Sequence, residues 1–193
     1  MPRTDEEPEL AFATADDWER WLERHHERPS GVWLRVAKKG AGVPSVTHSE
    51  ALDVALCFGW IDARGAPVDD RFWLLRFTPR APRSRWSQNN VDRIAALERA
   101  GRMREAGRAE VERAKADGRW EAAYPGRRSA TVPEDLQRAL DANPAARDFF
   151  ATLDSANRYA ILYRVHEARR PRTREQRIER FVAMLAAGEK IHP

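Results

Sequence analysis

The sequence predicts an α+β fold, in which a small mixed α/β N-terminal part is followed by a helical C-terminal half. Runs of strand-like residues occur only within residues 1–80. From residue 87 onward, apolar residues recur at helical spacing behind capping residues. We therefore expect a mixed part over 1–86 with two or more strands, a helical connection over 87–123 and a helical module over 130–193. The 193 residues suffice for one large domain or two small ones.

The N-terminal part is predicted to begin with an amphipathic helix that ends before Gly31. Thr14 is placed to cap it, and Trp18, Leu22 and His25 follow on one face.

Two strands and a second helix follow. Val32–Ala37 has the length and alternation of a strand. The capping box Thr47–Glu50 opens a helix over Ser49–Phe58. Arg71–Phe77, rich in aromatic and aliphatic residues, reads as another strand that stops at Pro79.

The rest of the chain is predicted to be helical. Ser87 or Asn90 can cap a helix that stops at Gly101, and a further turn or helix runs over 105–118. Residues 124–129 are the best linker candidate. Other helix starts are signalled by the capping boxes Thr131–Glu134 and Thr173–Gln176 and by the pair Asn143–Pro144.

The apolar stripes of these helices predict a set of buried residues. They are Trp18, Trp21, Leu52, Leu56, Phe181 and Leu185. Cys57, the single cysteine, is expected to be a buried thiol, and it leaves no internal disulfide. The sequence lacks the common zinc, phosphate-loop and nucleophile-elbow motifs. It therefore predicts no metal site, no cofactor and no catalytic residue.

Basic residues indicate an anion-binding surface. The chain has 30 arginines and 4 lysines, a ratio typical of a GC-rich coding bias, which makes the tandem Lys38–Lys39 unusual. Residues 71–91 hold five arginines and no acid, interleaved with aromatic residues and two prolines. The predicted anion- or partner-binding residues are Lys38, Lys39, Arg76, Arg80, Arg83, Arg85, Trp86 and Asn90.

A second candidate site follows the Ser49–Phe58 helix. Trp60, Asp62 and Arg64 stand at alternate positions, so an extended backbone would point all three to one face. With Trp73 they could line a polar pocket. The alternative is a core tryptophan beside a surface Asp62–Arg64 pair.

The chain shows no targeting or membrane signal. Its N-terminus is acidic and lacks an apolar signal core, and no stretch approaches the roughly 20 apolar residues that a membrane span needs. We expect a cytoplasmic protein without a membrane span.

Several long sequence segments resemble those of a known protein family. KKGAGVPSVTHSEALDVALCFGWIDA, FWLLRFTPRAPRSRWSQNN and AKADGRW resemble the YdeI/OmpD-associated family of bacterial proteins, also described as bacteriocin-protection proteins. NRYAILYRVHEARRPRTREQRIERFVAMLAAGEK is similar to the helical C-terminal module of that family. The resemblance implies a role in tolerance of antimicrobial peptides or bacteriocins, and it supplies no catalytic residues.

Three functions compete. The first is a non-enzymatic, stress-associated binding protein that docks a small oxyanion or an acidic protein segment on the arginines of residues 71–91. The second is a nucleic-acid-binding module that uses the same arginines, with Trp73 and Trp86 as stacking platforms. The third is an enzyme with a pocket around Trp60, Asp62 and Arg64. The first is favoured, because the net charge of +4 is low and no acid–base constellation is visible.

Overall fold

The computed structural model describes residues 7–127 and 129–193. The chain divides into two compact units, with the boundary between Ala123 and Tyr124. Residues 1–6, where the absence of a signal core was noted, and Arg128 of the predicted linker lie outside the described residues. The strands lie in the first unit and the second unit is helical, which confirms the α+β prediction. No helix in the described part of the chain is both long and apolar enough to cross a membrane.

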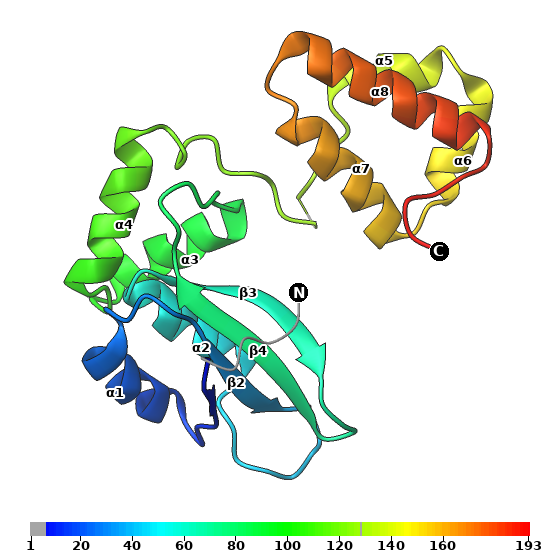
Figure 1. The fold of residues 1–193 in the computed structure, drawn as a ribbon. Coiled ribbons are helices and arrows are strands. Elements are labelled where there is room, and N and C mark those ends of the chain that lie inside the picture. Colours follow the sequence, from blue (N-terminus) through cyan, green and yellow to red (C-terminus); the bar gives the residue numbers. More distant parts are fainter. Residues whose placement is uncertain (1–6, 128) are drawn as a thin grey trace. The chain divides into compact units, whose positions relative to one another are not determined.

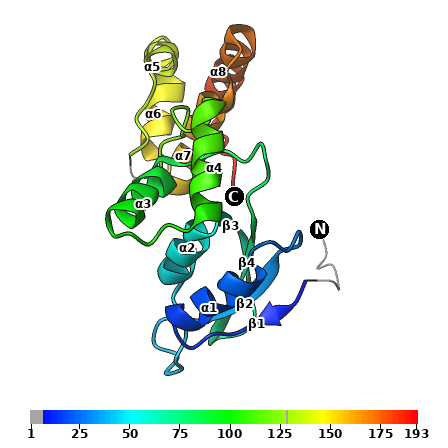
Figure 2. The same ribbon diagram turned by 90° about the vertical axis from the view of Figure 1, so that its left-hand side faces the viewer.

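A mixed four-stranded sheet forms the centre of the first unit, in the order β1-β2-β4-β3. Figure 1 shows β2, β4 and β3 side by side, and Figure 2 shows the short β1 beside β2. β4 pairs antiparallel with both neighbours, and β1 pairs parallel with β2. The strands are β1 (Glu9–Leu10), β2 (Val32–Ala37), β3 (Trp60–Pro67) and β4 (Phe72–Pro79).

The β2 prediction is confirmed residue for residue, whereas β4 runs on to Pro79. Pro79 is opposite Trp60 at the end of the ladder, a position where a missing N–H is tolerated.

Four helices lie in the described part of the first unit, and hydroxyl side chains begin three of them. Thr14 and Thr47 accept hydrogen bonds from the third residue of their helices, and Thr47 forms the full capping box with Glu50. Ser87 rather than Asn90 caps the third helix. The helices are α1 (Ala15–His25), α2 (His48–Cys57), α3 (Gln88–Arg99) and α4 (Glu105–Ala116).

One apolar core joins these helices to one face of the sheet. Trp18 and Leu22 of α1 belong to the same buried cluster as Val32, Leu34 and Phe77 of the sheet. The predicted burial of Trp18, Leu52 and Leu56 is confirmed, since each is at most 7% exposed. The full burial predicted for Trp21 is wrong. This ring is only partly buried, because it stacks between Trp18 and His25 at the edge of the core.

Two glycines let α2 and α4 pack closely. Gly59 ends α2 with a φ of +75°, a conformation that L side chains rarely adopt. A Cβ on Gly107 would lie 2.2 Å from the carbonyl oxygen of Cys57, so the two helix backbones touch there.

The second unit is a four-helix cluster with its own core. Phe181 and Leu185 are buried there, as predicted. Asn143 caps the second of its helices, as predicted. The helices are α5 (Glu134–Asp141), α6 (Pro144–Thr152), α7 (Ser155–Glu167) and α8 (Pro171–Ala186).

Two predicted capping boxes in the second unit are wrong. α5 has Pro133 at its N-cap and no side-chain cap, so Thr131 does not cap it. α8 already begins at Pro171, which places Thr173 inside the first turn. In α8, Pro171 stands at the first helical position with its φ preset for the helix, and this overrides the local hydroxyl signal.

A partly buried ion pair and a hydrogen bond from the same arginine connect three of these helices. The Arg174 guanidinium of α8 binds Asp135 of α5 in a fork, with Nε–Oδ2 at 2.5 Å and Nη2–Oδ1 at 2.9 Å. Its remaining nitrogen donates to the carbonyl oxygen of Val165 in α7 at 2.7 Å. The hydrogen bond from Arg174 holds the pKa of the Asp135 carboxyl below its usual range.

The Gly107 contact gives a stability prediction. Gly107→Ala should destabilise the protein by about 1–3 kcal/mol, because the added methyl forces α2 and α4 apart. Helix propensity alone would make the same change stabilising by about 1 kcal/mol. Urea denaturation distinguishes the two signs, with Ala109→Gly on the exposed face of α4 as a control for propensity. A more stable Gly107→Ala variant would contradict the close helix contact.

The Cys57 thiol gives a reactivity prediction. Burial raises the pKa of this thiol from 9.0 to about 11. The thiolate is the reactive form, so at pH 8 an aromatic disulfide reagent should modify Cys57 only after the protein is unfolded. Absorbance of the released thiolate, with and without denaturant, measures this. Rapid reaction of the folded protein would contradict both the burial and the raised pKa.

Candidate functional site

A pocket of about 600 Å³ opens on the first unit where β2 ends and α2 begins. We call it the lysine–tryptophan pocket. Cationic and polar groups come from the loop after β2 and from the start of α2, and apolar groups come from β2, β4 and the loop. The lining residues are Val36, Ala37, Lys38, Lys39, Val43, Ser45, Thr47, His48, Trp73 and Leu75.

Strand pairing and one side-chain hydrogen bond build this pocket. Val36 of β2 is opposite Trp73 of β4, so both side chains lie on the sheet face that carries α2. The Ser45 hydroxyl accepts a hydrogen bond from the backbone N–H of Ala37 at 3.0 Å, which closes the loop between β2 and α2. The loop therefore returns directly over the end of the strand and brings the start of α2 beside it.

The pocket combines positive charge with an aromatic face. Lys38 Nζ lies 5.0 Å from the centroid of the Trp73 ring, within cation–π range. Trp73 is 42% exposed, an unusual state for a large apolar side chain in this protein. Among the described residues, neither Lys38 nor Lys39 forms an ion pair. Both ammonium groups therefore remain available to an anion.

The start of α2 contributes two further polar groups. Hydrogen bonds from Thr47, the largest from its backbone N–H, hold the pKa of the Glu50 carboxyl below its usual range, so this carboxylate stays charged and caps the helix. His48 Nε2 lies 2.9 Å from an oxygen of Asp62 on β3. A carboxylate at this distance fixes the orientation of the imidazole ring at the edge of the pocket.

The structure does not bring Trp60, Asp62 and Arg64 together on one face of β3. Trp60 is 1% exposed, and its indole N–H donates to the carbonyl oxygen of His26 at 2.8 Å. A β-bulge follows Asp62, so Asp62 is opposite Phe77 while Arg64 is opposite Arg76.

Consecutive residues of β4 point to opposite faces, and the bulge therefore separates Asp62 from Arg64. The Arg64 guanidinium lies instead over the ring of Trp33, 5.1 Å from its centroid.

The residues of the predicted arginine surface fall into two groups, one engaged in contacts within the unit and one at the surface. Arg76 forms a two-bond ion pair with Glu7, with Nε–Oε2 at 2.7 Å and Nη2–Oε1 at 2.5 Å. Arg80 is only 5% exposed and lies 3.6 Å from the ring centroid of Trp86, which is itself 2% exposed. These three side chains are therefore engaged within the unit.

The other predicted binding residues remain at the surface. Arg83 and Arg85 are exposed, and Asn90 is partly buried in the first turn of α3. The structure thus brings together Lys38, Lys39 and Trp73, which the sequence had assigned to two different sites. His48 was missed as a pocket residue. Its position near the lysines could have been inferred from the sequence. The segment between Lys38 and the capping box at Thr47 is short, so the start of the helix must lie close to the lysines.

The contact between Arg80 and Trp86 predicts that substitutions of Arg80 and Arg83 differ in their effect on stability. Arg80→Gln should destabilise the protein by about 2 kcal/mol, since it removes a desolvated cation–π contact and hydrogen bonds to Ser84 Oγ and the Arg85 carbonyl. Arg83→Gln, at an exposed position, should change stability by less than about 0.5 kcal/mol. Chemical denaturation of the two variants measures the difference. Equal stabilities would mean that Arg80 is not part of the core.

Two family matches cover different parts of the chain, and the boundary between the two structural units lies between them. Residues 10–110 match the family described as Domain of unknown function (DUF8412), and residues 129–188 match the family described as Bacteriocin-protection, YdeI or OmpD-Associated. Two of the N-terminal segments that resembled the second family, residues 38–63 and 72–90, lie within the first match, and the third, residues 114–120, lies between the two matches. No curated protein and no solved structure matches the chain. The chain therefore belongs to the DUF8412 family over more than half of its length, and its C-terminal unit carries a YdeI/OmpD-associated bacteriocin-protection domain.

Proposed function

We propose that this protein is a binding protein of the bacteriocin-protection type whose N-terminal unit takes a small anion with a flat ring in the lysine–tryptophan pocket. One observation carries the proposal: Lys38, Lys39 and the exposed Trp73 converge on a single pocket. Its volume of about 600 Å³ falls among those of small-molecule sites, which span about 300–1,000 Å³.

The chemistry of the lining selects the ligand class. Two ammonium groups without ion partners among the described residues favour a negatively charged group. The Trp73 face favours a planar ring, because stacking on an exposed aromatic side chain is worth about 1–3 kcal/mol. Val36 and Leu75 provide an apolar floor for the same ring. A ligand with one ring and one oxyanion uses all of these groups.

A small ligand fits the pocket better than a nucleic acid does. Continuous single-strand binding needs several exposed aromatic platforms along a basic groove. Trp86, the second platform expected from the sequence, is buried beneath Arg80. An acidic protein segment would need a longer cationic surface than the two lysines offer, because Arg76 is already paired with Glu7.

Calorimetric titration with adenosine monophosphate tests the proposal, since this probe joins a planar ring to a phosphate. We expect weak binding that is lost as salt is raised, because salt screens exposed charges over about 10 Å at 0.1 M. Lys38→Gln/Lys39→Gln and Trp73→Ala should each weaken it at least about tenfold, equivalent to about 1.4 kcal/mol.

A matched control exists in the same unit. Lys115 also lies near a tryptophan, 5.8 Å from the ring centroid of Trp120, but outside the pocket. Lys115→Gln should leave the affinity unchanged. Adenosine should bind more weakly than its monophosphate if the lysines recognise the phosphate. Equal binding of the two, or full affinity in the double lysine variant, would refute the proposal.

A further inference from the structure

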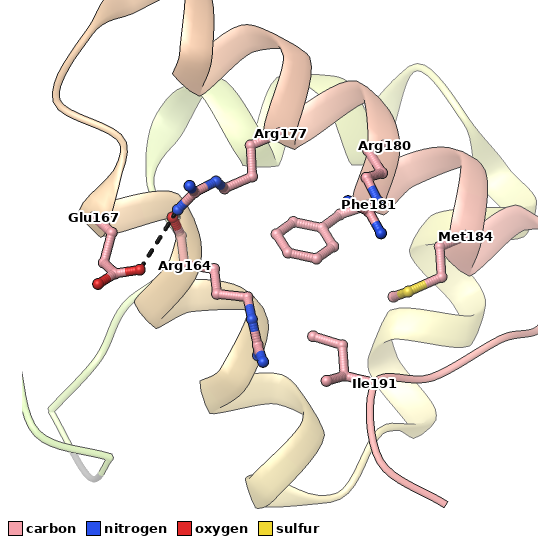
Figure 3. Close-up of a pocket in the computed structure, with 7 residues that line it drawn as sticks. All are labelled: Arg164, Glu167, Arg177, Arg180, Phe181, Met184 and Ile191. Atoms are coloured by element: carbon pink, nitrogen blue, oxygen red, sulfur yellow. Dashed lines mark hydrogen bonds and ion pairs between the residues drawn. The ribbon is translucent and has the colours of Figure 1, made fainter.

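The C-terminal unit has a separate pocket of about 460 Å³ between α7, α8 and the C-terminal tail. Figure 3 shows Phe181, Met184 and Ile191 gathered together, with the side chains of Arg164, Arg177 and Arg180 around them. The pocket therefore joins an apolar part to a cationic one. We call it the arginine pocket. Its only acidic lining residue is Glu167, within the part of the chain that the structure describes.

The cationic side is partly held in position before any ligand binds. Arg177 donates to the backbone carbonyl oxygen of Arg164 and lies 3.6 Å from Glu167 Oε2. Arg164 Nη1 donates to the carbonyl oxygen of Ala160 at 3.1 Å. Fixed guanidinium groups lose little freedom when they bind an oxyanion, so the ordering cost of binding is reduced.

Arg180 differs from its two neighbours. It is exposed, and its guanidinium makes no hydrogen bond or ion pair to any described residue. Three guanidinium groups and one carboxylate leave the pocket with an excess of two positive charges. Guanidinium forks match carboxylate and phosphate oxygens in geometry. The polar side of the pocket therefore suits an anion, with Arg180 as the group most available to it.

The apolar side is also a built wall. Phe181 is 6% exposed and belongs to the core of the unit. Ile191 is held by its neighbour in the chain. The buried Asn157 side chain accepts from the His192 backbone N–H at 2.8 Å and donates to the His192 carbonyl oxygen at 3.3 Å. Met184 adds a flexible thioether that adapts to the shape of an apolar guest.

We infer that the arginine pocket binds a free single-chain amphiphile, with a carboxylate or phosphate headgroup on the arginines and the apolar chain against Phe181, Met184 and Ile191. Charge complementarity selects the head, and the adjoining apolar wall selects the tail. A pocket volume of about 460 Å³ favours a single small molecule over a flat macromolecular surface.

Titration of the full chain with decanoate, below its micelle concentration, tests this inference. Decanoate should bind. Acetate, which lacks the tail, and decyltrimethylammonium, which reverses the charge, should bind at least about tenfold more weakly. Arg180→Gln and Met184→Gln should each weaken decanoate binding by a similar factor, with melting temperatures near that of the unmodified protein.

Control measurements distinguish binding at the arginine pocket from binding at the lysine–tryptophan pocket and from binding to a lipid membrane. Arg172→Gln, at an exposed position on α8 outside the pocket, should leave decanoate binding unchanged. Lys38→Gln/Lys39→Gln should also leave it unchanged, and Arg180→Gln should not affect binding of adenosine monophosphate. Failure of decanoate to bind, equal binding of decyltrimethylammonium, or binding only to vesicles of anionic lipid would overturn the inference.

Discussion

The first unit depends on one indole ring. Trp18 has no exposed surface, and its ring contacts Phe12, Trp21, Trp60 and Phe77. Its N–H donates to the Ala51 carbonyl oxygen at 3.1 Å, which fixes the distance between α1 and α2. The same side chain therefore packs both helices against the sheet and satisfies its own polar atom. Because α2 starts at the lysine–tryptophan pocket, the shape of that pocket follows from this packing.

In the second unit, polar interactions as well as apolar packing hold the helices in position. Burial of Phe181 and Leu185 is supplemented by the Arg174–Asp135 fork and by the buried Asn157. A buried amide or guanidinium is stable only when its hydrogen bonds are satisfied, so such groups accept few alternative arrangements. The positions of α8 and of the C-terminal tail, which form the arginine pocket, are specified in this way.

Local signals in the sequence were sufficient for much of the fold. Thr14, Thr47 and Asn143 begin helices because each needs only the next few residues to form its cap. Thr131 has the same chemistry but does not cap, since Pro133 occupies the N-cap position of α5. The two-residue strand β1 was not predicted, because it exists only through its pairing with β2.

The candidate site was predicted only in part, because it too depends on contacts between residues that are distant in the sequence. Lys38 and Lys39 stood out by composition. The environment of Arg80 could not be read locally, because an arginine between prolines looks exposed until Trp86 folds beneath it. Which arginines are surface groups is decided by contacts that residue spacing does not encode.

The bulge after Asp62 decides how charge is divided between the two sides of the sheet. One additional residue in β3 decides that Asp62 faces His48 while Arg64 faces Trp33. If Ala63 were paired as an ordinary strand residue, Asp62 and Arg64 would stand two positions apart in a regular strand and point to the same side, where they would neutralise each other. Substitutions at either position only adjust the strength of one contact. The partition of charge between the two sides of this sheet therefore depends on the local backbone irregularity of β3 rather than on the identity of either charged residue.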